Sequence, residues 1–129
     1  MTGPTRNLTL VAAALGFTGV LLGALGAHGP VHAILLREDA VENWKTAVLY
    51  HLVHAVALLA LAGWRDAHGG PGSRVAAAWV AGVVLFSGSI YALSLGGPRF
   101  LGPVTPLGGL ALLAGWLLLA LRAWRGPKS

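Results

Sequence analysis

Four long stretches without a charged side chain constrain this sequence more than any other feature. They contain 30, 19, 24 and 22 residues and lie between Arg6 and Arg37, Lys45 and Arg65, Arg74 and Arg99, and Arg99 and Arg122. A hydrocarbon core of about 30 Å is crossed by a helix of about 20 apolar residues. All four stretches therefore qualify as membrane-spanning helices, and we predict spans at Leu8–Ala27, Thr46–Trp64, Val75–Leu95 and Leu101–Leu121.

The composition excludes most other classes of protein. Apolar residues make up 56% of the 129 residues and charged residues 10%, whereas soluble domains carry about 25% charged residues. The net charge is +5, but the basic residues stand between the apolar stretches, so they indicate membrane orientation and no nucleic-acid partner. The absence of cysteine excludes disulfides and cysteine-bound zinc. We expect one all-α membrane domain over residues 1–129, a compact bundle of four transmembrane helices in a lipid bilayer.

The distribution of basic residues predicts the orientation. The N-terminus, the second loop and the C-terminus carry six Lys and Arg residues together, and the first and third loops carry three. The positive-inside rule then places both termini in the cytoplasm. A signal peptide is the alternative for the first stretch, but its run of about 18 apolar residues exceeds the usual signal core of about 7–15, so we expect no cleavage. The five tryptophans fall at or near span ends, as in an aromatic belt: Trp44, Trp64, Trp79, Trp116 and Trp124.

Three short loops join the predicted spans. The second contains the flexible turn His68–Gly72, and the third, at Gly96–Phe100, is a tight reversal. The longest loop runs from His28 to Asn43, and within it we predict a short interfacial turn of helix at Asp39–Asn43. The loops leave no room for a soluble domain.

Small residues on one face of each helix predict close packing. Helices in lipid gain little from the hydrophobic effect, so their association depends on contact at small side chains. In the first span the small residues fall within an arc of about 100°, opposite Leu10, Phe17, Leu21 and Leu25, which we expect to face lipid. The glycines that we predict at helix contacts are Gly16, Gly19, Gly23, Gly26, Gly82, Gly108 and Gly115.

Polar residues inside the spans gather in the half of the bundle that faces outward. In the second span Thr46, Tyr50, His51 and His54 share one face, and at about 1.5 Å per residue His54 lies about 15 Å below Trp44. Ionisable residues are costly inside a membrane, so they normally face the bundle and mark a site or a structural bond. The residues that we expect in a ligand site or polar cluster are His28, Thr46, Tyr50, His51, His54, Ser87, Tyr91 and Thr105.

Two interpretations of this cluster remain open. The side chains either hydrogen-bond neighbouring helices, at about 0.6 kcal/mol per bond, or line a site for a ligand, an ion or a proton. The spacing of His51 and His54 suits one shared metal ion, with His28 as a third ligand, but the spans contain no carboxylate to complete it. A haem needs ligands on opposite faces, which these two histidines do not offer. We therefore predict no catalytic residue, no metal and no cofactor.

Four blocks of the sequence resemble a known family. They are Gly23–Gly29, Trp44–Ala55, Leu85–Tyr91, and Gly102–Gly109 with Ala114–Trp116, and they occur in the order of the small membrane proteins called domain of unknown function 423. That family includes YgdD-like bacterial proteins and transmembrane protein 256, and the resemblance covers nearly the whole chain. It implies an uncleaved, multi-pass protein of the inner membrane and supplies no reaction. Many members of the family look to have a glutamine at the position after Tyr50, where this chain has His51. A role that either glutamine or histidine can fill indicates hydrogen bonding.

These observations favour a non-enzymatic structural or accessory membrane component, alone, as a homo-oligomer or within a larger assembly. The alternative is a protein that binds or transports a small molecule, a lipid or a quinone in the polar half. A haem- or metal-dependent membrane protein is the third hypothesis. The sequence leaves open whether the histidines bind a ligand or join helices.

Overall fold

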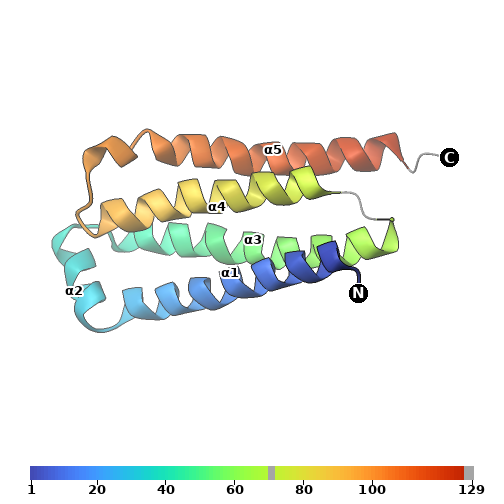
Figure 1. Cartoon of the computed structure of the whole chain (residues 1–129). Helices are drawn as coiled ribbons and strands as arrows, with labels where there is room; N and C mark the ends of the chain where they lie inside the picture. Colours follow the sequence, from blue (N-terminus) through green and yellow to red (C-terminus); the bar gives the residue numbers. More distant parts are fainter. Residues whose placement is uncertain (70–71, 127–129) are drawn as a thin grey trace.

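The computed structural model is helical, with four long helices that lie side by side (Figure 1). It describes residues 1–69 and 72–126, so Gly70 and Pro71 of the predicted turn and Lys128 of the C-terminal charge count lie outside the described residues. The elements are α1 (Gly3–Ala27), α2 (Gly29–Arg37), α3 (Val41–Ala67), α4 (Ser73–Ser94), the 3₁₀ helix η1 (Arg99–Leu101) and α5 (Val104–Arg125). The four long helices are long and apolar enough to cross a membrane. The predicted all-α fold with four transmembrane helices is therefore confirmed.

The helices extend beyond the predicted spans because their hydrogen-bonded turns continue past the apolar runs. Thr2 caps α1 by accepting a hydrogen bond from the Thr5 backbone N–H, and Pro4 occupies the first turn, where no N–H is needed. Helix α5, the fourth predicted span, instead begins at Val104, later than the predicted Leu101. Pro103 is its N-cap, and the residues before it form the separate helix η1.

The helix in the first loop lies earlier than we predicted. The structure places α2 at Gly29–Arg37. Of the predicted turn over Asp39–Asn43, residues 41–43 are helical as the first turn of α3, whereas Asp39 has a left-handed backbone with φ of 51°, so a separate helical turn there was wrong. Two features explain the difference. Pro30 lies in the first turn of α2, where proline is favoured. Leu35, which has no exposed surface, fixes α2 by packing against Trp44 in a small core cluster.

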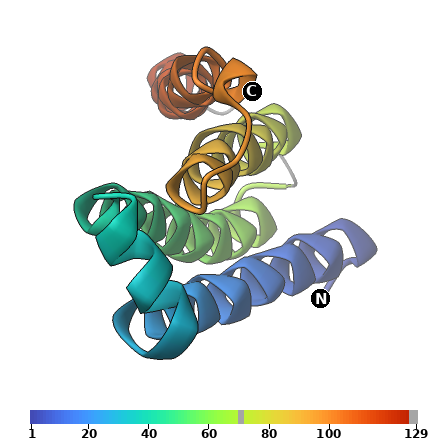
Figure 2. The same ribbon diagram turned by 90° about the vertical axis from the view of Figure 1, so that its left-hand side faces the viewer.

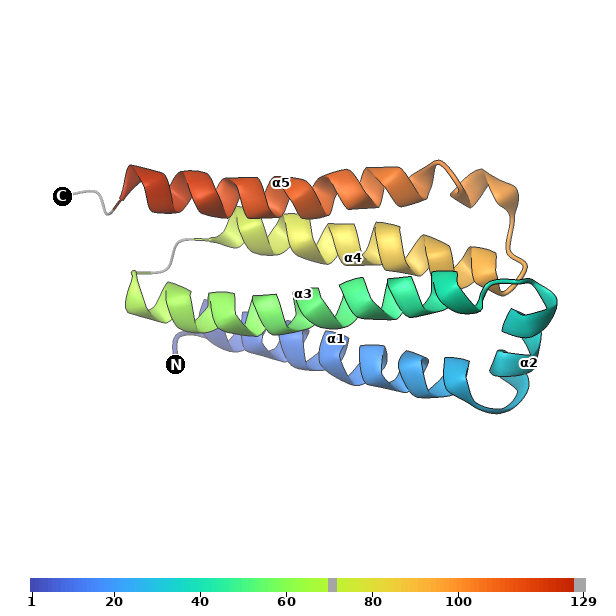
Figure 3. The ribbon, with the colours of Figure 1, turned by 180° about the vertical axis from the view of Figure 1, so that it is seen from behind.

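The long helices form a row in which each packs against its neighbour in sequence. Helix α1 packs against α3, α3 against α4, and α4 against α5, and within the described residues the other pairs of long helices make at most marginal contact. Figure 2 shows this row along the helix axes, with α1 and α5 at its two edges. The start of α1 and the end of α5 lie at the same end of the long helices, here called the terminal end, and α2 lies at the other, the α2 end (Figures 1 and 3).

Two apolar clusters hold the row together. The larger joins all four long helices through buried residues that include Ala12, Leu58, Trp79 and Leu112. The smaller lies at the α2 end around Leu35 and Trp44. Trp44 and Trp79 are 3% and 1% exposed, so the interpretation as an aromatic belt was wrong for these two residues. Trp124, in the last turn of α5, is 89% exposed and fits it.

Candidate functional site

His54 sits where α3, α4 and α5 meet, and both of its ring nitrogens are hydrogen-bonded. Its Nδ1 lies 2.7 Å from the Tyr50 carbonyl oxygen, and the Trp116 indole N–H lies 3.1 Å from its Nε2. A carbonyl only accepts and an indole only donates, so Nδ1 carries the proton and Nε2 accepts. The ring is 3% exposed and packs against the rings of Trp79 and Trp116, with centroids 6.0 Å away in each case.

His51 lies one turn nearer to the α2 end and joins α1 to α4. Its Nδ1 is 2.9 Å from the Tyr91 hydroxyl and its Nε2 is 3.1 Å from the Thr18 hydroxyl. Thr18 donates its only hydroxyl proton to the Ala14 carbonyl, so its oxygen accepts from His51 Nε2–H. The Tyr91 hydroxyl then donates to Nδ1. The two histidines therefore carry their protons on opposite nitrogens, because their partners differ.

Serine, threonine and tryptophan side chains make the same kind of link between neighbouring helices. Ser87 donates to the Ala47 carbonyl at 2.7 Å and so joins α4 to α3. Ser89 and Thr105 share a hydrogen bond of 2.5 Å between α4 and α5. The Trp44 indole donates to the Leu22 carbonyl at 2.8 Å and joins α3 to α1. Each of the three packed helix pairs is thus tied by polar side chains as well as by apolar contact.

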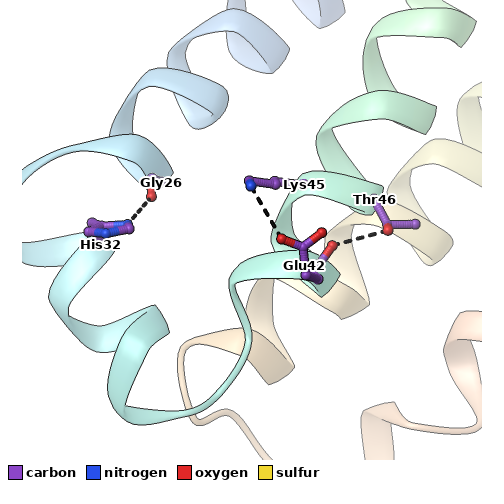
Figure 4. Close-up of polar contacts among 5 residues, drawn as sticks. All are labelled: Gly26, His32, Glu42, Lys45 and Thr46. Atoms are coloured by element: carbon purple, nitrogen blue, oxygen red, sulfur yellow. Dashed lines mark hydrogen bonds and ion pairs between the residues drawn. The ribbon is translucent and has the colours of Figure 1, made fainter.

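The other predicted members of the cluster make no side-chain hydrogen bond to a neighbouring helix among the described residues, although the Tyr50 ring stacks on His54 with the centroids 6.3 Å apart. Tyr50 is 41% exposed and packs its ring against Phe86, with the centroids 4.9 Å apart. Thr46 is exposed and donates to the Glu42 carbonyl within its own helix (Figure 4). His28 is exposed in the junction between α1 and α2. Its neighbour His32 donates from Nδ1 to the Gly26 carbonyl at 2.9 Å, which ties α2 to α1 (Figure 4).

Most of the glycines named from the sequence lie against a neighbouring helix. A Cβ at Gly19 would lie 2.6 Å from Leu52, one at Gly23 would lie 3.3 Å from Val48, and one at Gly82 would lie 2.5 Å from Leu112. Gly26 and Gly115 face the indole rings of Trp44 and Trp79, and Gly108 meets the backbone of α4 at Leu85 and Phe86. Gly16 differs, since a Cβ there would meet nothing within 4 Å.

A cavity at the α2 end lies apart from the histidines. It has a volume of about 350 Å³ and is lined by Glu38, Ala40, Asn43, Ile90, Leu93, Ser94 and Thr105. Thr105 is the only residue of the predicted cluster in this lining. Among the described residues, no three His, Asp or Glu side chains come together in a group that could hold a metal ion.

Sequence reasoning missed the partners of the two histidines. Thr18 stands in a predominantly apolar span and had no predicted role, and Trp116 was assigned to the membrane interface. Both lie on helices that are distant from α3 in sequence, so only the packing of α1 and α5 identifies them as partners. The depth argument put Ser87 and Tyr91 in the same half of the membrane as His51 and His54, and in the structure Ser87 bonds to Ala47 and Tyr91 to His51.

Four membrane-spanning helices tied by buried polar side chains define a small multi-pass membrane protein. The family model described as "Protein of unknown function (DUF423)" matches residues 22–109, and the chain belongs to this family. It is 42% identical to the UPF0382 membrane protein YwdK of Bacillus subtilis over 79% of this chain and 83% of that protein. It is 38% identical to the UPF0382 inner membrane protein YgdD of Escherichia coli over 94% of this chain and 92% of that protein. No solved structure matches the chain.

Proposed function

We propose that the chain is a non-enzymatic structural or accessory component of the inner membrane, with both termini in the cytoplasm. One observation supports this function above all: the buried polar side chains in the spans bond to other helices of the same chain. His51 uses both nitrogens in this way, with Thr18 of α1 and Tyr91 of α4. His54 bonds to Trp116 of α5 through Nε2, while its Nδ1 bonds to the Tyr50 carbonyl within α3. A residue that binds a ligand needs a free donor or acceptor that faces a cavity, whereas these rings are 5% and 3% exposed and fully bonded.

The exposed face of α4 supports a role in assembly. Helices in lipid associate where small residues allow their backbones to approach. Ala77, Ala81 and Gly88 are exposed on this face, with the larger Val84 between the last two, and a Cβ at Gly88 would meet nothing within 4 Å. This face is free to receive a helix of another subunit, either a second copy or a different membrane protein.

Native mass spectrometry of the protein extracted in a polymer-bounded patch of its own membrane tests this function. We expect the chain to be released with other polypeptide chains and with no retained molecule except lipid. Gly88→Leu should remove the associated chains and leave the fold intact, whereas Gly16→Leu, at an equally open glycine of α1, should retain them. A retained cofactor or metabolite that is lost on His54→Leu would contradict the proposal.

The cavity at the α2 end supports a second candidate, the binding of a small polar molecule. Its volume of about 350 Å³ lies at the lower limit for ligand sites, which is about 300 Å³. Glu38, Asn43 and Thr105 supply polar groups to its wall. For this candidate the retained molecule should be lost on Asn43→Leu and kept on His54→Leu, which separates the two functions in one experiment.

A further inference from the structure

The terminal end contains a second and larger cavity, between the ends of three helices. Helix α4 begins short of the level at which α3 and α5 end (Figure 1). Residues at the ends of these three helices line a cavity of about 1320 Å³. Its polar lining comes from the end of α3, the first turn of α4 and the last turns of α5, and it includes Trp64, His68, Arg74, Arg122 and Arg125.

The described residues that line this cavity include three arginines and no acidic residue. The chain has four acidic residues, of which Glu38, Asp39 and Glu42 belong to the α2 end. The fourth, Asp66, accepts a hydrogen bond from the Thr5 hydroxyl of α1 at 3.1 Å and is not part of the lining. Three exposed arginines, Arg74, Arg122 and Arg125, therefore line one cavity without an acidic side chain among its described lining residues. Such a cavity attracts an anion from outside the chain.

The first turn of α4, which lines part of the cavity, also favours an anion. This helix has no side-chain cap and no acidic residue in its first turn. The first N–H groups of a helix have no intrahelical acceptor, and they carry the positive end of the helix dipole. Arg122 and Arg125 offset the negative end of α5, but Arg74 stands in the first turn of α4, where the dipole disfavours a cation. A bound anion between Arg74 and the arginines of α5 would remove this conflict.

The apolar part of the lining indicates what kind of anion fits. Leu118 and Leu121 lie on α5 toward the membrane interior, and Trp64 stands at the level where amphipathic rings meet lipid headgroups. The ligand is therefore charged at one end and apolar at the other. Basic pockets between transmembrane helices bind phosphate headgroups in this way, because arginine pairs with phosphate through two parallel hydrogen bonds.

We propose that the cavity lined by Arg74, Arg122 and Arg125 binds the phosphate headgroup of an anionic phospholipid, with the acyl chains against Leu118 and Leu121. The site lies at the opposite end of the row from the cavity at Glu38 and Thr105, and it shares no residue with the histidine cluster. It goes beyond the structural role proposed above, and either can fail without the other.

The test compares the retention of phosphatidylglycerol and phosphatidylcholine by the purified full chain in detergent, measured by native mass spectrometry. We expect preferential retention of phosphatidylglycerol. Arg74→Gln and Arg122→Gln should each weaken it about fivefold, the effect of removing one arginine near an anionic headgroup. Arg6→Gln is the matched control, because Arg6 is an exposed arginine of α1 at the same end and outside the lining. Circular dichroism verifies that each variant is folded, and two variants on different helices keep the test valid if one of them is not.

Two results would overturn the proposal. The first is equal retention of the two lipids. The second is a loss of phosphatidylglycerol for Arg6→Gln as large as for Arg74→Gln and Arg122→Gln, which would show only a general attraction of anionic lipid to the basic end of the protein. A further arm adds millimolar inorganic phosphate without lipid. If inorganic phosphate protects the chain from thermal unfolding while phosphatidylglycerol is not preferred, the cavity takes a soluble phosphate compound and the lipid assignment is wrong.

Discussion

Replacing Gly108 by alanine should separate α4 from α5 and destabilise the protein. A Cβ at Gly108 would meet the Phe86 backbone nitrogen and would lie 2.7 Å from both the Leu85 carbonyl carbon and the Phe86 Cα. These atoms belong to a helix backbone and cannot rotate away as a side chain does. The two helices must therefore move apart by roughly 1 Å, and a gap of that size removes up to half of the dispersion energy of each contact it opens.

The magnitude follows from two opposing effects. Overpacking costs about 1–3 kcal/mol, and a backbone clash belongs at the upper limit. Alanine also gains about 1 kcal/mol over glycine in helix propensity, so we expect Gly108→Ala to lower the free energy of unfolding by about 2 kcal/mol. Gly109→Ala is the matched control, since a Cβ there would lie an ordinary 3.7 Å from the Phe86 ring. This variant should gain the propensity without the clash.

Unfolding by sodium dodecyl sulfate in mixed micelles, followed by circular dichroism, gives both free energies. The difference between the two variants should be about 3 kcal/mol, a factor of roughly 150 in the unfolding equilibrium. Equal midpoints for Gly108→Ala and Gly109→Ala would refute the close approach of α4 and α5 on which this reasoning rests.

Two further predictions concern the buried polar side chains and use the same unfolding assay. His51→Gln should keep the free energy of unfolding within about 1 kcal/mol of the original value, because the amide can accept from Tyr91 and donate to Thr18. His51→Leu should lower it by about 1–2 kcal/mol. Equal effects of the two variants would show that these hydrogen bonds add no stability. Trp44→Phe should cost more than Trp79→Phe, since the Trp44 indole donates to the Leu22 carbonyl and the buried Trp79 N–H has no partner among the described residues. The reverse order would contradict the assigned bonds.

The sequence predicted the fold well because lipid imposes a simple length requirement. A helix that crosses about 30 Å of hydrocarbon needs about 20 residues without charge, so such helices can be recognised in the sequence. The residues that face lipid on α1 were also predictable, and Leu10 and Phe17 are 61% and 72% exposed. The helix in the first loop was misplaced, because its position depends on Pro30 in the first turn of α2 and on the packing of Leu35 against Trp44.

The sequence predicted that some polar residues of the spans lie near one another, but it did not predict their hydrogen bonds or the partners Thr18 and Trp116. Helical periodicity showed that His51 and His54 share a face, and depth placed Tyr91 beside them. Neither argument specifies which helix lies across from which ring. His54 of α3 bonds to Trp116 of α5 although within the described residues these two helices make at most marginal contact, and Trp79 of α4 packs against both rings. The basic cavity was likewise invisible, since Arg74 and Arg122 are far apart in sequence and were counted only as orientation signals.

The protonation of the two histidine rings tests most directly the claim that they join helices and bind no ligand. Nitrogen-15 NMR of the histidine-labelled full chain in lipid nanodiscs distinguishes protonated from unprotonated ring nitrogens, and His51→Gln assigns the signals. The structure predicts a proton on Nδ1 of His54, bonded to the Tyr50 carbonyl, and a proton on Nε2 of His51, bonded to Thr18. Trp116→Phe should shift the Nε2 signal of His54 and leave His51 unchanged. The same tautomer at both residues, or a His54 signal that does not respond to Trp116→Phe, would contradict the account.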